Sequence, residues 1–278
     1  MNTKRRIQIG VGRASILAFG AACIGAFATG CINLPAEPVD PIVPVATNCV
    51  KPISGLLSGW WAFDEGADTA RIWDRSGNMN TGDHFNGVMP NVGTFGSGGL
   101  SFDGSKSYIE IPNSASLNFS AGHSLGMTFW IKCPSGAPTL LESVIDKRVG
   151  YPAPLGYHVF LYQGKVGVQI ADGVTYANYI GPALPLTSST KWTFVAISIN
   201  RGPTPRIDWS IDGVTSSTPT PTMPMGSLGN TAPLRIAAHS YAYDMDPHFK
   251  GTLDEVAVYK DAIPSTLVEQ LHRLPMCK

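Results

Sequence analysis

The stretch YHVFLYQGKVGVQIA, residues 157–171, points most directly to the fold of this chain. In it, two runs alternate between apolar and other side chains, and the pair Gln163 and Gly164 separates them. Alternation with a period of two is typical of strands that bury one face. A short glycine-containing connection between two such runs is typical of a hairpin turn. The stretch therefore predicts two neighbouring antiparallel strands.

Further strands are predicted on both sides of this hairpin. Residues 107–111 alternate up to a proline, and residues 192–200 and 206–212 form a second pair that is followed by an Asp–Gly turn. One face of the last run consists of Ile207, Trp209 and Ile211. Gly (30 residues) and Pro (22 residues) are both frequent, as expected for a fold with many tight turns.

One segment, residues 264–274, has a helical pattern instead. Pro264 stands near its start, Ser265 is the predicted N-cap, and three leucines follow on one stripe. Many short strands followed by one terminal helix predict an all-β sandwich with one short C-terminal helix.

The balance of charges excludes one class of partner. The 20 Lys and Arg residues equal the 20 Asp and Glu residues, and charged residues make up only 14% of the chain. A nucleic-acid-binding face needs a surplus of cations to replace counterions, so we expect no nucleic-acid partner. Hydrophobic residues make up 44%, which is enough for a substantial core.

Residues 1–31 have the layout of a signal peptide. A basic start precedes an apolar run, Ala14 to Ala28, that is too short to cross a bilayer comfortably. Small residues before Cys31 resemble the lipobox of bacterial lipoproteins, in which the cysteine carries the lipid. This interpretation predicts an exported protein anchored to a membrane of the cell envelope. Ordinary cleavage near Ala28, which would give a secreted protein, and an uncleaved anchor are the alternatives.

Residues 32–48 form a proline-rich segment. Prolines at intervals of three favour an extended polyproline II conformation, which suits a tether between an anchor and a folded domain. A plain disordered linker is the alternative. The four prolines are Pro35, Pro38, Pro41 and Pro44.

Three cysteines remain in the predicted domain, residues 49–278. An exported protein lies in an oxidising compartment, where disulfides are permitted. Cys49 and Cys277 stand at the two ends of the domain and can pair if the terminal strands are neighbours. Cys133 follows an alternating run and is predicted to be a buried free thiol.

Six motifs in this domain resemble, in order, the laminin-G-like, concanavalin-A-like group of lectin and glucanase domains. They are GLLSGWWAFDE (55–65), WDRSGN (73–78), LSFDG (100–104), YIEIPNS (108–114), WTFVA (192–196) and FKGTLDEV (249–256). The resemblance implies a jelly-roll sandwich of two antiparallel sheets over residues 49–278.

The resemblance also implies one structural calcium ion where the first and last strands meet. Oxygen ligands would come from Glu65, Asp74, Asn78 and Asp254, with backbone carbonyls completing the set. Alternatively, Asp74 and Asn78 are turn formers that bond their own backbone, and Asp254 is a polar residue on a strand.

Glucanases of this group carry two acidic residues in an E-x-D-x-x-E-like run, and the chain has no such run. Asp254 and Glu255 are adjacent, so on a regular strand they would point to opposite faces. Nucleophile-elbow, zinc-protease and phosphate-loop motifs are absent from the sequence as well. We therefore predict a protein that is not an enzyme, with an unrecognised glycan hydrolase as the alternative.

The segment from Ala238 to His248 is the candidate binding region, because sugars are bound by aromatic faces together with polar groups. Its candidate ligand-binding residues are His239, Tyr241, Tyr243, Asp244 and Asp246. A second group, Tyr151, Tyr157, Tyr176 and Tyr179, either lines a groove or belongs to the core. The leading prediction is a binding protein for carbohydrate or another cell-envelope component. A structural or adhesion protein that acts through protein–protein contacts is the runner-up.

Overall fold

The computed structural model describes residues 48–66, 70–95, 98–134, 141–150, 152–185, 190–241 and 248–277. All of them belong to one compact unit, residues 47–278. The predicted signal peptide, Cys31 and nearly the whole predicted tether lie outside the described residues. No described helix is long and apolar enough to cross a membrane.

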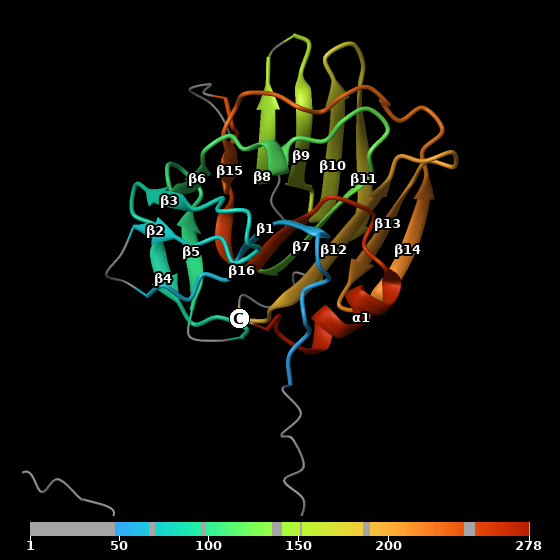
Figure 1. Ribbon diagram of the computed structural model, residues 1–278. Helices are drawn as coiled ribbons and strands as arrows, with labels where there is room; N and C mark the ends of the chain where they lie inside the picture. The colour runs from blue at the N-terminus through green and yellow to red at the C-terminus, as the bar shows by residue number, and fades with distance from the viewer. Residues whose placement is uncertain are drawn as a thin grey trace, which may run out of the picture. The chain divides into compact units, whose positions relative to one another are not determined.

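Two antiparallel sheets form a sandwich (Figure 1). The first sheet contains β1 (Leu57–Trp61), β4 (Met89–Asn91), β5 (Gly99–Asp103), β7 (Leu125–Lys132), β12 (Thr193–Asn200), β13 (Arg206–Ile211), β14 (Val214–Pro219) and β16 (Lys250–Tyr259). The second sheet contains β2 (Arg71–Ile72), β3 (Gly82–Phe85), β6 (Tyr108–Ile111), β8 (Glu142–Val149), β9 (Leu155–Tyr162), β10 (Lys165–Asp172), β11 (Tyr176–Ala183) and β15 (Leu234–Ile236). The predicted all-β sandwich is confirmed.

In both sheets, strands that are distant in the sequence lie next to each other. The first sheet runs β14-β13-β12-β7-β16-β5-β4, with β1 also paired to β16. The second sheet runs β11-β10-β9-β8-β15-β6-β3-β2. Each sheet therefore combines strands from both ends of the domain, and the closing strands β15 and β16 lie in the sheet interiors.

The predicted hairpins are present. Strands β9 and β10 pair along their whole length, and Gln163 (φ 50°) and Gly164 (φ 73°) form the turn between them. Asp212 (φ 48°) and Gly213 (φ 80°) make the same kind of turn between β13 and β14. Two successive residues with positive φ are the geometry that matches the twist of a tight hairpin.

Two hydrophobic clusters stabilise the unit. The main core lies between the sheets and includes Phe129, Val159 and Trp209. A second cluster lies between the first sheet and the helix α1 (Ser265–Arg273), where Trp60 and Trp130 contact the apolar side of the helix. Both tryptophans are therefore core residues.

The C-terminal helix begins at the residue predicted to be its N-cap, one residue earlier than expected. Pro264 occupies the N-cap position with extended backbone (φ −57°, ψ 136°) and makes no side-chain cap hydrogen bond. Ser265 is the first helical residue, so its prediction as the N-cap is wrong. Proline suits this boundary because its fixed φ and missing N–H are compatible with the start of a helix.

The two ends of the unit are joined. Val50 and Met276 form a parallel bridge, and Cys49 and Cys277 form a disulfide, as predicted. Cys133 is a buried free cysteine, also as predicted. Burial raises the pKa of its thiol to about 12, so at neutral pH it stays an unreactive thiol.

Candidate ligand-binding groove

Strand periodicity brings polar side chains together on the outer face of the second sheet, the face turned away from the main core. On β9, Val159 and Leu161 enter the core, so His158, Phe160 and Tyr162 point outward. The same alternation turns Gln169 of β10 and Asp146 of β8 outward next to His158, since the three residues pair directly across the strands.

A groove of about 410 Å³ lies over these strands. It combines two amides and two imidazoles with an arginine and several aromatic or aliphatic side chains. Its lining residues are Leu141, Arg148, His158, Phe160, Tyr162, Gln169, Asn178, Ile180, His239 and Tyr241.

A buried hydrogen-bond network supports the groove. Arg148 Nε lies 2.8 Å from Asp146 Oδ1, and Arg148 Nη2 lies 2.7 Å from Asp146 Oδ2. His239 Nδ1 lies 2.7 Å from the same Oδ2, and its ring stacks on Tyr241 at 5.6 Å between centroids. The Arg148 guanidinium also lies over the Tyr241 ring and donates to Gln169. These contacts fix the loop that carries His239 and Tyr241 against the sheet.

The contacts with Arg148 determine which groups of the network are charged at neutral pH. Burial alone would raise the pKa of Asp146, but the hydrogen bonds and the charge of Arg148 outweigh it and hold the pKa well below its usual range. Burial, together with the positive charge of Arg148, lowers the pKa of His158 well below 6.5. At neutral pH the groove therefore contains an ionised carboxylate paired with arginine, beside a neutral imidazole.

A metal ion does not fit this network as it stands. Potential ligand atoms of Asp146, His158 and His239 lie within 4.8 Å of one another, a donor set that suits a transition metal. However, Arg148 Nη2 lies 2.7 Å from Asp146 and 2.9 Å from His239 Nδ1. The guanidinium therefore takes the place that a cation would need.

Ser143, His239 and Asp146 do not form a hydrolase triad either. Ser143 Oγ and Asp146 Oδ2 both contact the same nitrogen, His239 Nδ1, at 3.1 Å and 2.7 Å. A Ser–His–Asp triad needs serine and aspartate on different ring nitrogens. Glu142 lies outside the groove, because its carboxylate faces the backbone N–H of Lys250 and raises the pKa of Cys133. Glu142 and Asp146 therefore do not face a common substrate position.

The structure places two of the predicted binding residues in this groove, His239 and Tyr241. Tyr243, Asp244 and Asp246 lie outside the described residues. The prediction omitted Arg148, His158, Gln169 and Asn178. The alternation along the strands could have identified two of them, because His158 and Gln169 are polar residues within largely apolar runs.

The concanavalin A-like lectin/glucanases superfamily model matches residues 103–268, more than half of the chain. The chain belongs to this superfamily. The match confirms the resemblance read from the sequence motifs and agrees with the two-sheet sandwich. No curated protein sequence matches the chain.

Several solved structures share the superfamily fold at low identity. The binding domain of Paraclostridial Mosquitocidal Protein 1 is 18% identical with a TM-score of 0.62, and the match covers 78% of this chain and 52% of that one. Domain 4 of AbnA, a GH43 extracellular arabinanase from Geobacillus stearothermophilus solved with arabinotriose, is 19% identical with a TM-score of 0.56, covering 78% and 98%. The botulinum neurotoxin serotype D ligand-binding domain, solved with N-acetylneuraminic acid, is 13% identical with a TM-score of 0.56, covering 78% and 50%. The chain thus spans about half the length of the first of these structures.

Two residues of the calcium ligand set implied by the superfamily resemblance, Asp74 and Asn78, are engaged in hydrogen bonds within the protein. Both oxygens of Asp74 accept hydrogen bonds, from the N–H groups of Trp60 and Ser76 on one side and from Ser76 Oγ and Asn80 N–H on the other. These donors use the lone pairs that a cation would need. The Asn78 amide nitrogen donates to the carbonyls of Leu57 and Ser58.

Each of the other two proposed calcium ligands accepts a backbone hydrogen bond, although Glu65 Oε2 is buried and has no hydrogen-bond partner among the described residues. Glu65 Oε1 lies 3.2 Å from the Trp73 N–H, and Asp254 Oδ2 accepts from the Thr94 N–H at 2.6 Å. Calcium binding by this member of the superfamily stays a prediction that these contacts do not support.

The expectation that Asp254 and Glu255 face opposite ways is wrong because β16 is not regular there. Its pairing with β7 shifts register between Asp254 and Ala257, and Glu255 has a positive φ of 50°. Glu255 Oε2 accepts from Trp60 Nε1 at 2.7 Å, in the cluster under α1, and Asp254 accepts from the nearby Phe95 N–H. A β-bulge re-aims side chains in this way.

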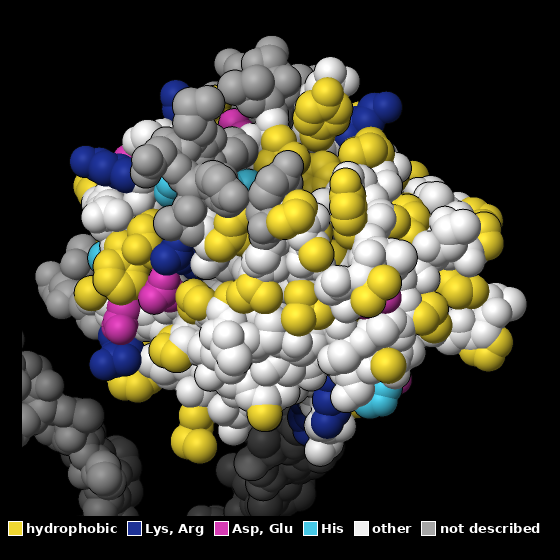
Figure 2. All heavy atoms as spheres, turned by 90° about the horizontal axis from the view of Figure 1, so that it is seen from above, with side chains coloured by type: hydrophobic (Ala, Val, Ile, Leu, Met, Phe, Trp, Pro, Cys, Tyr) yellow, Lys and Arg dark blue, Asp and Glu magenta, His cyan; other side chains and the backbone are white. Residues whose placement is uncertain are grey.

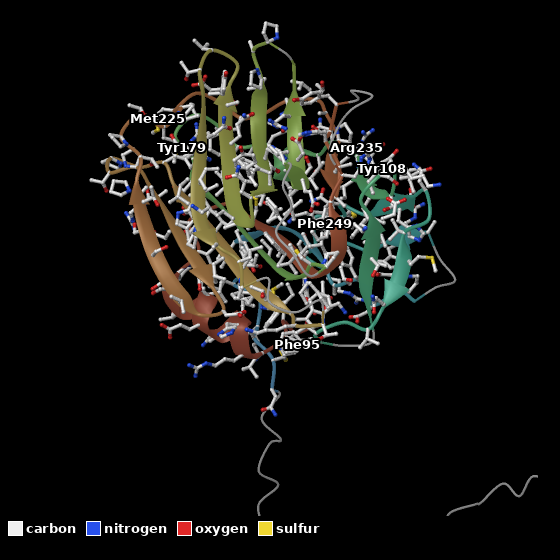
Figure 3. All side chains as sticks on the ribbon, turned by 180° about the vertical axis from the view of Figure 1, so that it is seen from behind. Phe95, Tyr108, Tyr179, Met225, Arg235 and Phe249 are labelled. Atoms are coloured by element: carbon white, nitrogen blue, oxygen red, sulfur yellow. A yellow bond between two sulfur atoms is a disulfide. The ribbon has the colours of Figure 1, made fainter. Side chains whose placement is uncertain are left out.

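The second group of tyrosines does not line one groove. Tyr157 is fully buried in the main core and donates to the Leu117 carbonyl, while Tyr179 packs against that core. Tyr176 is exposed, and Tyr151 lies outside the described residues. Figure 3 shows Tyr179 on the β11 side of the sandwich.

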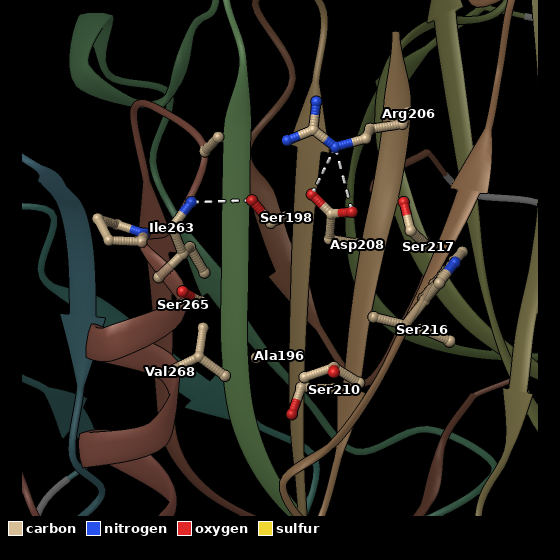
Figure 4. A pocket seen from close by; sticks show the side chains of 14 residues that line it. Ala196, Ser198, Arg206, Asp208, Ser210, Ser216, Ser217, Ile263, Ser265 and Val268 are labelled. Carbon is tan, nitrogen blue, oxygen red and sulfur yellow. Dashed lines mark hydrogen bonds and ion pairs between the residues drawn. The ribbon is translucent and has the colours of Figure 1, made fainter.

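A second groove, of about 550 Å³, lies on the outer face of the first sheet beside α1 (Figure 4). Small hydroxyl side chains such as Ser210 and Ser217 line it, together with the Arg206–Asp208 ion pair at 3.0 Å. The single aromatic lining residue, Trp209, is 1% exposed. Of these two grooves, the one with His158 and Tyr241 is therefore better suited to stack on a ligand.

Proposed function

We propose that the chain is a non-catalytic carbohydrate-binding protein whose ligand lies in the groove over β8, β9, β10 and β11. The observation that supports this is the composition of the groove, which places fixed amide groups beside exposed apolar side chains. A sugar presents hydroxyl groups and apolar C–H faces, so it needs both kinds of contact.

The polar side of the groove is held in a defined orientation. Gln169 Nε2 donates to Asn178 Oδ1 at 2.7 Å, while Gln169 Oε1 accepts from Arg148. This chain of hydrogen bonds leaves the Asn178 amide nitrogen directed away from Gln169, where it can donate to a ligand hydroxyl. A group that is ordered before binding loses less conformational entropy on binding.

The apolar side of the groove is open to solvent. Tyr162 is 40% exposed and Ile180 is 45% exposed, on neighbouring parts of the groove wall. In Figure 2, which shows the molecule from above, hydrophobic side chains lie among uncharged ones over the middle of the view, and most charged side chains lie toward its edges. The sugar complexes of the arabinanase domain and the neurotoxin domain support a carbohydrate ligand for this fold.

Binding to a glycan array, followed by calorimetry with the best ligand, tests the proposal. The Asn178→Ala variant should lose about tenfold in affinity, as expected for one hydrogen bond. Ser217→Ala, an exposed change on β14 in the other sheet, is the matched control and should bind like the wild type. Absence of binding on every glycan, or equal affinity for the two variants, would contradict the proposal.

One observation favours the alternative of an adhesion protein that acts through protein contacts. Large hydrophobic side chains are exposed along residues 73–92, among them Trp73 (54%) and Met79 (87%). Exposed apolar side chains of this size are suited to a protein interface. Cross-linking in the cell envelope would favour this function if a Trp73→Ser variant lost a partner while glycan binding stayed unchanged.

For location, we propose export and lipid attachment at Cys31, since a basic start, a short apolar run and small residues precede that cysteine. Metabolic labelling with palmitate should mark the wild-type chain and not the Cys31→Ser variant. Labelling of both chains would contradict attachment at this residue.

A structural calcium ion also stays part of the proposal, on the superfamily resemblance alone. Thermal unfolding in calcium and in chelator tests it, because an ion bound only by the folded state raises the melting temperature. Equal melting temperatures in calcium and in chelator would contradict calcium binding.

A further inference from the structure

We propose that the ammonium group of Lys147 occupies a cation-binding site inside the domain, and that this site binds a potassium-sized monovalent cation when the lysine side chain is removed. The site lies between β8, the short 3₁₀-helix η1 (Ala115–Leu117) with its flanking residues, and the segment that precedes β15. Its residues do not line the groove, and they are not among the four predicted calcium ligands.

The alternation of β8 turns Lys147 toward the interior of the sandwich. Ile145 belongs to the main core, and Lys147 follows it two residues later, so both side chains point between the sheets. Lys147 is 0% exposed. A buried ammonium group is costly unless polar partners replace its water, so these partners decide whether a lysine is stable at this position.

Five oxygen atoms surround the ammonium group and form an oxygen cage. Its Nζ lies 2.9 Å from Asn113 Oδ1 and 3.0 Å from Asn118 Oδ1. Asn230 contributes its carbonyl at 3.2 Å and its Oδ1 at 3.3 Å, and the Ala232 carbonyl lies at 3.1 Å. An ammonium group has only three N–H donors, so the oxygens outnumber the directed hydrogen bonds that it can form. The arrangement is therefore that of a coordination shell around a spherical cation.

The amide groups of the oxygen cage are oriented by bonds that do not involve the ammonium group. Asn118 Nδ2 donates to Asn113 Oδ1 at 3.1 Å, and Asn118 Oδ1 accepts from the Asn230 N–H at 3.1 Å. Asn230 Nδ2 donates to the carbonyls of Lys147 and Leu155 at 3.0 Å and 2.9 Å. These bonds use the nitrogen ends of two amides and leave their oxygen ends directed at the centre. We therefore expect the oxygen cage to persist when Lys147 loses its side chain.

The chemistry of the oxygen cage favours a large monovalent cation. All five oxygens belong to side-chain amides or peptide groups, so none of them carries a negative charge that would offset a divalent ion. Calcium needs oxygens at about 2.3–2.6 Å, whereas these oxygens lie 2.9–3.3 Å from Nζ. Neutral carbonyl oxygens are the ligands that potassium channels use. The oxygen cage thus fits an ammonium or a potassium ion.

The protonation of Lys147 agrees with this role. Burial lowers the pKa of its ammonium group to about 8. The group therefore still carries its proton at neutral pH and places a positive charge at the centre of the five oxygens.

Thermal unfolding of the full-length chain tests the proposal in potassium chloride and in choline chloride at equal ionic strength, since choline is too large for the oxygen cage. Lys147→Ala removes the ammonium group and should unfold at a lower temperature than the wild type in choline. Potassium at about ten times its dissociation constant should then raise the melting temperature of this variant by about 4 °C relative to the wild type.

Two controls isolate the effect of the emptied site. Lys147→Met fills the space without a charge, so potassium should not raise its melting temperature relative to the wild type. Lys165→Ala, an exposed change at the start of β10, is the matched loss of a lysine elsewhere and should also be insensitive to potassium.

A second measurement, on the wild-type chain, does not depend on the stability of the variants. In a heteronuclear NMR spectrum of the lysine ammonium groups at neutral pH, exposed groups exchange their protons with water too fast to be detected. The enclosed group should give a sharp signal that is absent from Lys147→Met. A Lys147→Ala variant that gains no stability from potassium, or a wild-type spectrum without such a signal, would overturn the proposal.

Discussion

Asp146 and Arg148 form a buried ion pair beneath the groove, with side chains that are 0% and 5% exposed. Two residues apart on an alternating strand, they share a face, so their proximity could be predicted from the sequence. Their third partner could not. His239 lies 93 residues from Asp146 in the chain, and it reaches the pair from the segment after β15, in which Ala237 has a positive φ of 71°.

The Asp146→Asn change should destabilise the fold strongly, because it leaves the Arg148 charge buried without its counter-ion. Breaking a buried pair by removing one partner costs about 3–5 kcal/mol. Chemical denaturation of the variant measures the loss. Asp208→Asn, which breaks the exposed pair with Arg206, is the matched control and should cost about 1 kcal/mol or less. Equal losses for the two variants would contradict the structural role of the buried pair.

At the scale of single elements, regular strands and tight turns could be predicted from the sequence, and irregular elements could not. The hairpin of β9 and β10 follows from alternation and from Gln163–Gly164. The bulge in β16 depends on its two neighbours, β1 and β7, which are remote in sequence. It brings Glu255 into the apolar cluster under α1, where burial raises the pKa of its carboxyl group to about 8.

This raised pKa gives stability a defined pH dependence. The folded state keeps a proton on Glu255 that the unfolded state releases near pH 4.5, so stability falls as the pH rises from about 4.5 to about 8. Asp254, with a pKa of about 6 that burial also raises, contributes in the same direction at lower pH. Glu255→Gln should therefore flatten the fall in melting temperature between pH 5 and pH 8, while still accepting the hydrogen bond from Trp60.

Glu269→Gln, on the exposed side of α1, is the control for this measurement and should follow the wild-type pH profile. A Glu255→Gln profile as steep as that of the wild type would show that the carboxyl group is ionised in the folded protein.

At the scale of the whole molecule, the sequence motifs predict the superfamily, but the strand order within each sheet emerges only in three dimensions. The placement of Arg235 between Asp146 and Glu110 depends on that order, because β15 must lie between β8 and β6. The binding residues expected from one loop were therefore only part of the site. Most of it comes from the sheet face beneath that loop.

The disulfide also constrains the whole molecule, because it joins Cys49 to Cys277, which are 228 residues apart in the sequence. Loop closure of this length stabilises a fold by about 5 kcal/mol on the chain-entropy model, with less usually realised. The Cys49→Ser, Cys277→Ser double variant should unfold at a lower denaturant concentration, and adding a reductant should lower the wild-type midpoint to the same value. An unchanged midpoint would mean that the termini stay joined without the bond.

The central claim is that a glycan lies on the outer face of the second sheet. The most direct measurement is a crystal structure of the chain with the oligosaccharide that binds best. We expect a sugar between Asn178 and Tyr241. A sugar in the groove beside α1, or on the loops at either end of the sandwich, would contradict it.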